Sequence, residues 1–408
     1  MNVQNRITVL LGAGAMMDVT TLSCHSITEN VISKEQIQFG EGGWESVPFL
    51  SFLYDRLKEY YRRERASVNF EDIFHALEML SSVKTAEGGQ AAKSFRSVFG
   101  MLCDLKEDFA GISQTLIYSS MRELIDIVIE NVAQFEGSVY EEDWFPNFFK
   151  SLEETAPLDL FTLNYDTWLE QIIGNYNDGF IPFCETHQRF SANQLFLESN
   201  RLSTINHLHG QICFTSHLPD RSERILTDGW YKANSYDIIK GLRIFPRHPG
   251  FMAKTQAAEQ IYQYPIITGL RKNDKIMTPP FDAYYAHLYQ KLRCNKNLLI
   301  IGYGFGDLYI NSLLNQFRSF HGREGNVICV GYLNPIEWTG SIVDMPFPIS
   351  MKQSIYTLFQ DSPMSHDFLT TEYSDCIDSP NKKSKLFLCG FKSAVESYGE
   401  DIVRFYET

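Results

Sequence analysis

LDLFTLNYD, residues 158–166, is the stretch that decides the fold predicted for this chain of 408 residues. Its apolar first part is typical of a buried parallel strand, and the strand ends abruptly in Asn164, Tyr165 and Asp166. Open α/β sheets bind their ligands at the carboxyl ends of their strands. We therefore expect the polar residues at the end of this strand to face a ligand.

Other segments fit the same sheet once this strand is placed at its centre. They are residues 7–18, 205–210, 297–307 and 326–332. These segments alternate with helical patterns, so the sequence predicts an α/β fold built on a parallel sheet.

Two of these segments run directly into glycines, namely ITVLL-GAGA (7–15) and NLLII-GYGFGD (297–307). Glycines after a strand let backbone N–H groups approach a pyrophosphate, and two such loops favour a ligand with two halves, such as a dinucleotide. The dinucleotide fingerprint has a third glycine or alanine where this chain has Met17. A tight turn that binds nothing therefore remains an alternative for GAGA.

Long helical periodicity separates the first two strands. Asn69 is a plausible N-cap for a helix with an apolar face, and a second apolar stripe runs from Ile117 to Phe135. We interpret both stripes as core and predict a sheet domain (1–43 and 156–335) with a helical insertion (44–155). The remaining residues, 336–408, are predicted to form a small C-terminal extension with a strand at 385–391 and a terminal helix.

Composition narrows the class of protein. The 44% hydrophobic and 21% charged residues suffice for a packed core, and the formal charge of −14 argues against a chain that coats nucleic acid. The eight cysteines are scattered without a CxxC pair, which predicts reduced thiols and no structural zinc. We find neither a signal peptide nor an apolar run long enough for a membrane span, so we expect a cytoplasmic protein that does not contact membranes.

His207 and His209 stand two residues apart in INHLHG (205–210). On a strand this spacing directs both imidazoles to the same side, as a metal pair requires. A third metal ligand is not evident nearby, apart from Cys213 and His217. We therefore favour a catalytic His209 over a structural histidine or a metal site.

The ordered set GAGA (12–15), TLNYD (162–166), HLHG (207–210) and GYGFGD (302–307) resembles the sirtuin-like domains of bacterial antiphage-defence proteins. The resemblance implies a Rossmann-like sheet with a helical insertion, and NAD as the bound molecule. It implies no zinc here, because the four-cysteine ribbon of protein-deacetylating sirtuins has no counterpart. The proline and arginine pattern that those enzymes carry after the first glycine loop is also missing from MMDVTT (16–21).

The same resemblance assigns roles to individual residues. It makes Asn164 the amide that holds the nicotinamide ribose and the attacking water, Asp166 the contact to the carboxamide, and His209 the catalytic histidine. The loop assigned to the pyrophosphate is Gly12, Ala13, Gly14 and Ala15, and the loop assigned to the adenosine side contains Gly302, Gly304 and Asp307.

The enzyme hypothesis that follows is an NAD hydrolase that forms nicotinamide and ADP-ribose and depletes NAD during phage infection. The resemblance also implies a homo-oligomer that docks a HerA-type ATPase, with nucleic acid contacted only through that partner. The main alternative is a catalytically silent subunit that binds NAD or ADP-ribose and regulates a defence complex. A dehydrogenase is disfavoured by the missing third glycine, and a nuclease by the acidic balance and the lack of a carboxylate metal cluster.

Overall fold

The computed structural model describes most of the chain. The described residues are 5–20, 22–39, 47–61, 67–84, 112–140, 143–197, 202–215, 229–240, 264–269, 272–334, 349–359, 374–379 and 381–407.

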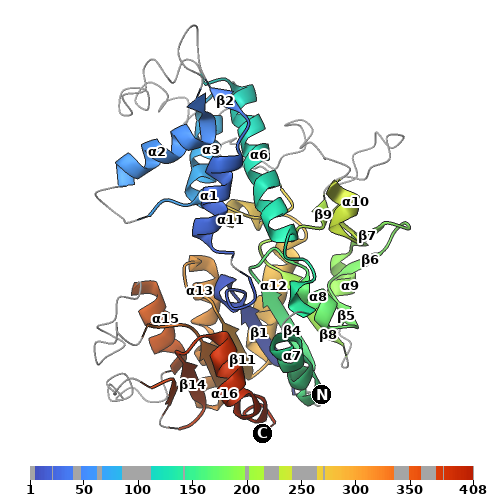
Figure 1. Ribbon diagram of the computed structural model, residues 1–408. Helices are drawn as coiled ribbons and strands as arrows, with labels where there is room; N and C mark the ends of the chain where they lie inside the picture. The colour runs from blue at the N-terminus through green and yellow to red at the C-terminus, as the bar shows by residue number, and fades with distance from the viewer. Residues whose placement is uncertain are drawn as a thin grey trace.

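An eight-stranded sheet forms the centre of the molecule (Figure 1). In spatial order its strands are β13 (Cys376–Asp378), β14 (Ser384–Phe387), β12 (Asn326–Val330), β11 (Asn297–Ile301), β1 (Ile7–Leu11), β4 (Leu158–Thr162), β8 (Ser203–His207) and β5 (Tyr176–Asn177). Only β13 at one edge is antiparallel to its neighbour. The predicted α/β class and the Rossmann-like, mostly parallel sheet are therefore confirmed.

The order of the strands reverses beside β1. From β1 the chain first adds β4, β5 and β8 on one side, and then returns to add β11, β12 and β14 on the other. A reversal of this kind opens a crevice at the carboxyl ends of the strands, where ligands of such sheets bind. The two glycine loops follow β1 and β11, so both lie at this reversal.

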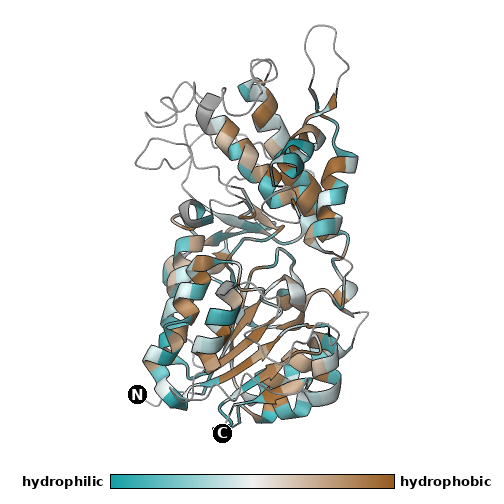
Figure 2. Ribbon diagram, turned by 90° about the vertical axis from the view of Figure 1, so that its left-hand side faces the viewer, coloured by the Kyte–Doolittle hydropathy of each residue, from teal (hydrophilic) through white to brown (hydrophobic). Residues whose placement is uncertain are grey.

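Helices cover both faces of the sheet, which is why every residue of β1, β4, β8, β11 and β12 is buried. One face packs against α12 (Phe281–Cys294), α13 (Leu308–Leu314), α14 (Phe317–His321) and α15 (Ile349–Phe359). The other face packs against α7 (Trp144–Thr155), α8 (Trp168–Ile172) and α16 (Phe391–Arg404). Figure 2 shows the hydrophobic strands enclosed between these helices.

A separate helical module lies above the carboxyl edge of the sheet (Figure 1). It consists of α1 (Cys24–Lys34), α2 (Phe49–Tyr61), α3 (Phe70–Lys84) and α6 (Gln114–Ala133), which share one apolar core. Asn69 caps α3 as predicted, because its Oδ1 accepts the N–H of Glu71 at 2.9 Å. Both predicted apolar stripes are buried in this core except Phe135, which is partly buried and packs against the core on the α7 face of the sheet.

Packing crosses two of the predicted domain limits. Helix α1 precedes residue 44 but packs with the helical module, whereas α7 precedes residue 156 but packs on the sheet against α16. The C-terminal extension adds β14 and α16 to the sheet itself. The exact domain boundaries therefore stay a prediction.

Two small antiparallel sheets complete the described fold. One contains β6 (Phe180–Pro182), β7 (His187–Phe190), β10 (Tyr231–Ala233) and β9 (Phe214–Thr215), and the other pairs β2 (Gln38–Phe39) with β3 (Val47–Pro48). Within the described segments, no helix combines the length and the apolar character needed to cross a membrane.

Replacing Gly302 with Ala should destabilise the fold. Gly302 has φ +60°, and a Cβ at this position would lie 2.0 Å from the N atom of Ala15. The left-handed backbone and the steric overlap together should lower the free energy of unfolding by about 2 kcal/mol or more, measured by chemical denaturation. Gly306→Ala is the matched control, since its Cβ would meet nothing within 4 Å. Equal stability of the two variants would contradict this account.

Candidate active site

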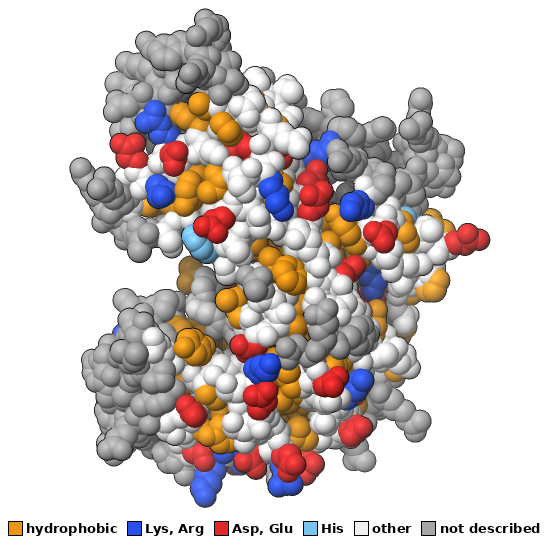
Figure 3. Space-filling model, viewed as in Figure 1, with side chains coloured by type: hydrophobic (Ala, Val, Ile, Leu, Met, Phe, Trp, Pro, Cys, Tyr) orange, Lys and Arg blue, Asp and Glu red, His pale blue; other side chains and the backbone are white. Residues whose placement is uncertain are grey.

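A cavity of about 690 Å³ lies between the carboxyl edge of the sheet and the helical module. The space-filling view is hollowed between the same two parts of the molecule (Figure 3). The sheet side of the wall comes from the segments that follow β1, β4, β8 and β11, and the helical side includes the first turns of α1 and α3. The sheet edge at which the sequence predicted a ligand therefore borders a partly open cavity of cofactor size.

The two glycine loops pack directly on each other beside this cavity. The N–H of Gly14 donates to the carbonyl oxygen of Gly302 at 2.9 Å, and a Cβ on Gly12 would lie 2.5 Å from that same oxygen. Gly12, Ala13 and Gly304 line the cavity, whereas Gly14 and Gly302 make the contact behind it. Close packing of one loop on the other thus requires glycine at positions that do not themselves line the cavity.

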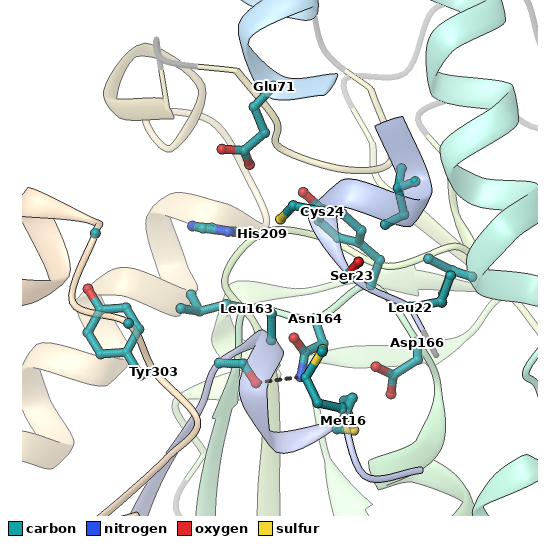
Figure 4. A pocket seen from close by; sticks show the side chains of 18 of the residues that line it. Met16, Leu22, Ser23, Cys24, Glu71, Leu163, Asn164, Asp166, His209 and Tyr303 are labelled. Atoms are coloured by element: carbon teal, nitrogen blue, oxygen red, sulfur yellow. Dashed lines mark hydrogen bonds between the residues drawn. The ribbon is translucent and has the colours of Figure 1, made fainter. Parts of the chain in front are cut away.

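Asn164 follows β4 and lies at the floor of the cavity (Figure 4). Its Nδ2 donates to the carbonyl oxygen of Gly12 at 3.2 Å, and its backbone N–H donates to Thr162 Oγ1 at 3.0 Å. These two bonds fix the amide against the first glycine loop. The predicted site residue is therefore held by the neighbouring strand end and not by its own strand alone.

Asp166 lines the cavity two residues further on. Its Oδ1 accepts the N–H of Trp168, the first residue of α8, at 3.1 Å. Burial raises the pKa of its carboxyl to about 6, and the nearby Glu170 contributes in the same direction, while the Trp168 N–H and His207 oppose it. Asp166 is thus a carboxylate held in an environment that disfavours its charge.

His209 and Asp307 meet across the cavity, one after β8 and the other at the start of α13. His209 Nε2 and Asp307 Oδ2 lie 3.3 Å apart. Burial lowers the pKa of His209, and the positive charge of Lys272 adds to this effect. Burial alone would raise the pKa of Asp307, but its bond to His209 and the charge of that ring outweigh burial and lower it. The pair therefore joins a mainly neutral imidazole to an ionised carboxylate near pH 7.

His207 and His209 do not have the paired orientation that the metal alternative requires. Strand β8 ends at His207, so His209 stands in the following turn and the two-residue strand period does not apply to it. His207 Nε2 instead lies 2.8 Å from Glu170 Oε1, and this carboxylate raises the pKa of His207 against the opposing effect of burial. In the described residues there is no group of three or more His, Cys, Asp or Glu side chains placed to hold a metal ion.

Most of the residues predicted for the site line this one cavity, namely Gly12, Ala13, Asn164, Asp166, His209, Gly304 and Asp307. Gly14, Ala15 and Gly302 do not line it. Several lining residues were missed, among them Ser23 and Cys24 at the start of α1, Glu71 in α3 and Lys272 in α11 (Lys272–Lys275). No local motif marks these positions, because only the packing of α1, α3 and α11 brings them to the sheet edge.

The fold and the cavity define an α/β protein with a cavity of cofactor size at the carboxyl edge of a parallel sheet. Residues 159–335 match the family model described as SIR2-like domain. This match covers β4 to β12 and includes Asn164, Asp166, His209 and Asp307, and it supports a sirtuin-like protein with an NAD-related activity. No curated protein matches the chain.

Asp166→Asn should stabilise the protein at neutral pH. The folded state raises the Asp166 pKa to about 6, above its unfolded value. Above pH 6, the ionised Asp166 therefore lowers the free energy of unfolding. This cost disappears as the pH falls from 6 toward about 4. Asparagine keeps the acceptor for the Trp168 N–H, so we expect a gain of about 1 to 3 kcal/mol at about pH 7.5 that shrinks at about pH 4.5.

Denaturant unfolding at both pH values measures this difference. Asp307→Asn is the control, and it should destabilise the protein at neutral pH. The folded state lowers the pKa of the Asp307 carboxyl, so its ionised form stabilises the wild-type protein. A wild-type protein more stable than Asp166→Asn at about pH 7.5 would refute the assignment of a raised pKa.

Proposed function

We propose that this protein hydrolyses NAD to nicotinamide and ADP-ribose. The observation that carries the proposal is that Asn164 and His209, which follow different strands, line one cavity together with the glycine loops (Figure 4). The match to a SIR2-like domain supports NAD as the ligand. A volume of about 690 Å³ also lies within the range of roughly 300 to 1,000 Å³ found for cofactor sites.

In the proposed reaction the bond between ribose C1′ and the nicotinamide nitrogen breaks. The electron pair of this bond neutralises the pyridinium nitrogen, and positive charge builds on the ribose as in glycoside cleavage. The oxygen of a water molecule then bonds to C1′, and this water loses one proton. The products are nicotinamide, ADP-ribose and that proton.

The polar residues of the cavity suit these steps. The amide of Asn164 can donate to and accept from hydroxyl groups, so it can hold the ribose and orient the water. His209 is kept neutral by burial and can accept the proton, and Asp307 then stabilises the imidazolium that forms. Asp166 offers carboxyl oxygens to the carboxamide of nicotinamide.

The resemblance to antiphage-defence proteins supports a role for this activity in cytoplasmic NAD depletion. An unrestrained NAD hydrolase harms its own cell, so the activity needs control by assembly or by a partner. We propose a homo-oligomer that docks a HerA-type ATPase, which would engage nucleic acid in place of this acidic chain. The exposed sides of the helical module offer surface for such association.

His209→Ala should reduce NAD hydrolysis by about 10²- to 10⁴-fold, the usual contribution of a positioned acid or base. The assay measures free nicotinamide and ADP-ribose after incubation with NAD. His25→Ala removes an exposed histidine from α1 and should leave turnover unchanged. Turnover of the His209 variant within threefold of wild type would contradict the proposed mechanism.

Asn164→Ala should be equally damaging without loss of the fold, which thermal melting checks. A drop in melting temperature as large as that of a core Leu→Ala variant would instead make Asn164 a structural residue. Binding of ADP-ribose by the wild type without any release of nicotinamide would favour the silent regulatory subunit.

Association with the proposed HerA-type ATPase should change NAD turnover. A partner that binds the active state more tightly shifts the population of sites, by about 1.4 kcal/mol for each tenfold of activation. NAD turnover and mass by light scattering, measured for the protein alone and with the ATPase, test this. A monomer with full activity that no partner changes would rule out control by assembly.

A further inference from the structure

The backbone N–H groups that the sequence predicts for a diphosphate are largely engaged inside the protein. In the first glycine loop, the N–H of Gly12 donates to Ile301, that of Gly14 to Gly302, and that of Ala15 to Gly12, at 2.9 to 3.0 Å. These bonds fix the loop but leave it few donors for a ligand. A diphosphate in this cavity therefore needs a further positive group.

The helix N-termini at the cavity are occupied as well. Asp307 Oδ1 accepts the N–H groups of Tyr309 and Ile310 at the start of α13. Asp166 accepts from α8, and Ser23 accepts the N–H of Ser26 in α1. At each of these ends a side chain of the protein already accepts backbone N–H groups, and two of the accepting groups are carboxylates that repel an anion.

Lys272 is the only lysine or arginine among the described residues that line the cavity. The same wall carries the carboxylates of Glu71, Asp166 and Asp307. An anionic ligand would meet an excess of negative charge here unless Lys272 neutralised part of it.

Lys272 is held by a partner that it can leave. Its Nζ lies 2.9 Å from Glu71 Oε1 in the first turn of α3, and both side chains are 23% exposed. Ion pairs with this much solvent contact contribute little stability. Exchange of the Glu71 carboxylate for a phosphate would therefore cost little.

The second lysine of α11 has a different role. Lys275 pairs with Glu78 of α3 at 2.8 Å, both side chains are nearly fully buried, and Lys275 also donates to the carbonyl oxygen of Thr268. This buried pair attaches α11 to α3 whether or not Lys272 and Glu71 stay together. Lys272 can thus change partners without separating the helical module from the sheet side of the cavity.

We propose that Lys272 binds the diphosphate of the dinucleotide and that the ligand displaces Glu71 from it. The inference rests on the proposed function, since it assumes that an ADP-ribose group occupies this cavity. Lysine is suited to the role because its ammonium group makes short, charge-assisted hydrogen bonds to phosphate oxygens. Glu71 then acts as a stand-in anion that keeps Lys272 in place while no ligand is bound.

Calorimetric titration with ADP-ribose tests the proposal without turnover. Lys272→Met should weaken ADP-ribose binding at least tenfold, whereas Glu71→Gln should bind as tightly as wild type or more tightly, because the competing carboxylate is gone. The double variant should resemble Lys272→Met. Adenosine has no phosphate, so its affinity, measured by competition with ADP-ribose, should stay within twofold in every variant.

Lys150→Met is the matched control, since it removes the same charge from an exposed site on α7 and should bind ADP-ribose as wild type does. Melting temperatures verify that each variant is folded. Binding by Lys272→Met within twofold of wild type overturns the proposal, and so does recovery of wild-type affinity in the double variant, which would show that only the freed Glu71 weakens binding. Failure of wild type itself to bind ADP-ribose would overturn the proposed function as well.

Discussion

Contact between the two glycine loops is the constraint on which the site depends. Strand β1 pairs with both β4 and β11, so the loops that leave β1 and β11 meet at the point where the strand order reverses. They fit together only because Gly12, Gly14 and Gly302 have no Cβ. Asn164 then bonds to the carbonyl oxygen of Gly12, so the position of the proposed catalytic amide follows from this contact.

The opposite end of the same strands has its own buried polar cluster. Asp159 in β4 is fully buried and pairs with Arg6 at 2.7 Å, and it also accepts from Asn295 and Thr204. Burial alone would raise the pKa of Asp159, but the Arg6 guanidinium keeps it low. This buried charge connects β4 to β8 and to the residues just before β1 and β11. The cluster lies at the amino ends of the strands, away from the cavity at their carboxyl ends.

The helical module completes the cavity and supplies charges that act on the proposed catalytic pair. Glu71 from α3 and Lys272 from α11 both influence the pKa of His209, in opposite directions. The electrostatics of the site are therefore shared between the module and the sheet. The proposed exchange of Glu71 for a phosphate at Lys272 would change them.

The sequence by itself determined the central strands of the sheet, the two glycine loops and most of the polar residues at the strand ends, but not the edge strands β5 and β13. These features are local, because a buried strand, a glycine turn or the Asn69 cap depends on a few neighbouring residues. Tertiary structure alone decided that His209 pairs with Asp307 while His207 pairs with Glu170, and that Glu71 and Lys272 join the cavity wall. These contacts link residues far apart in the chain: the pairing of the parallel strands brings His209 to Asp307 and His207 to Glu170, and the packing of α3 and α11 at the sheet edge adds Glu71 and Lys272.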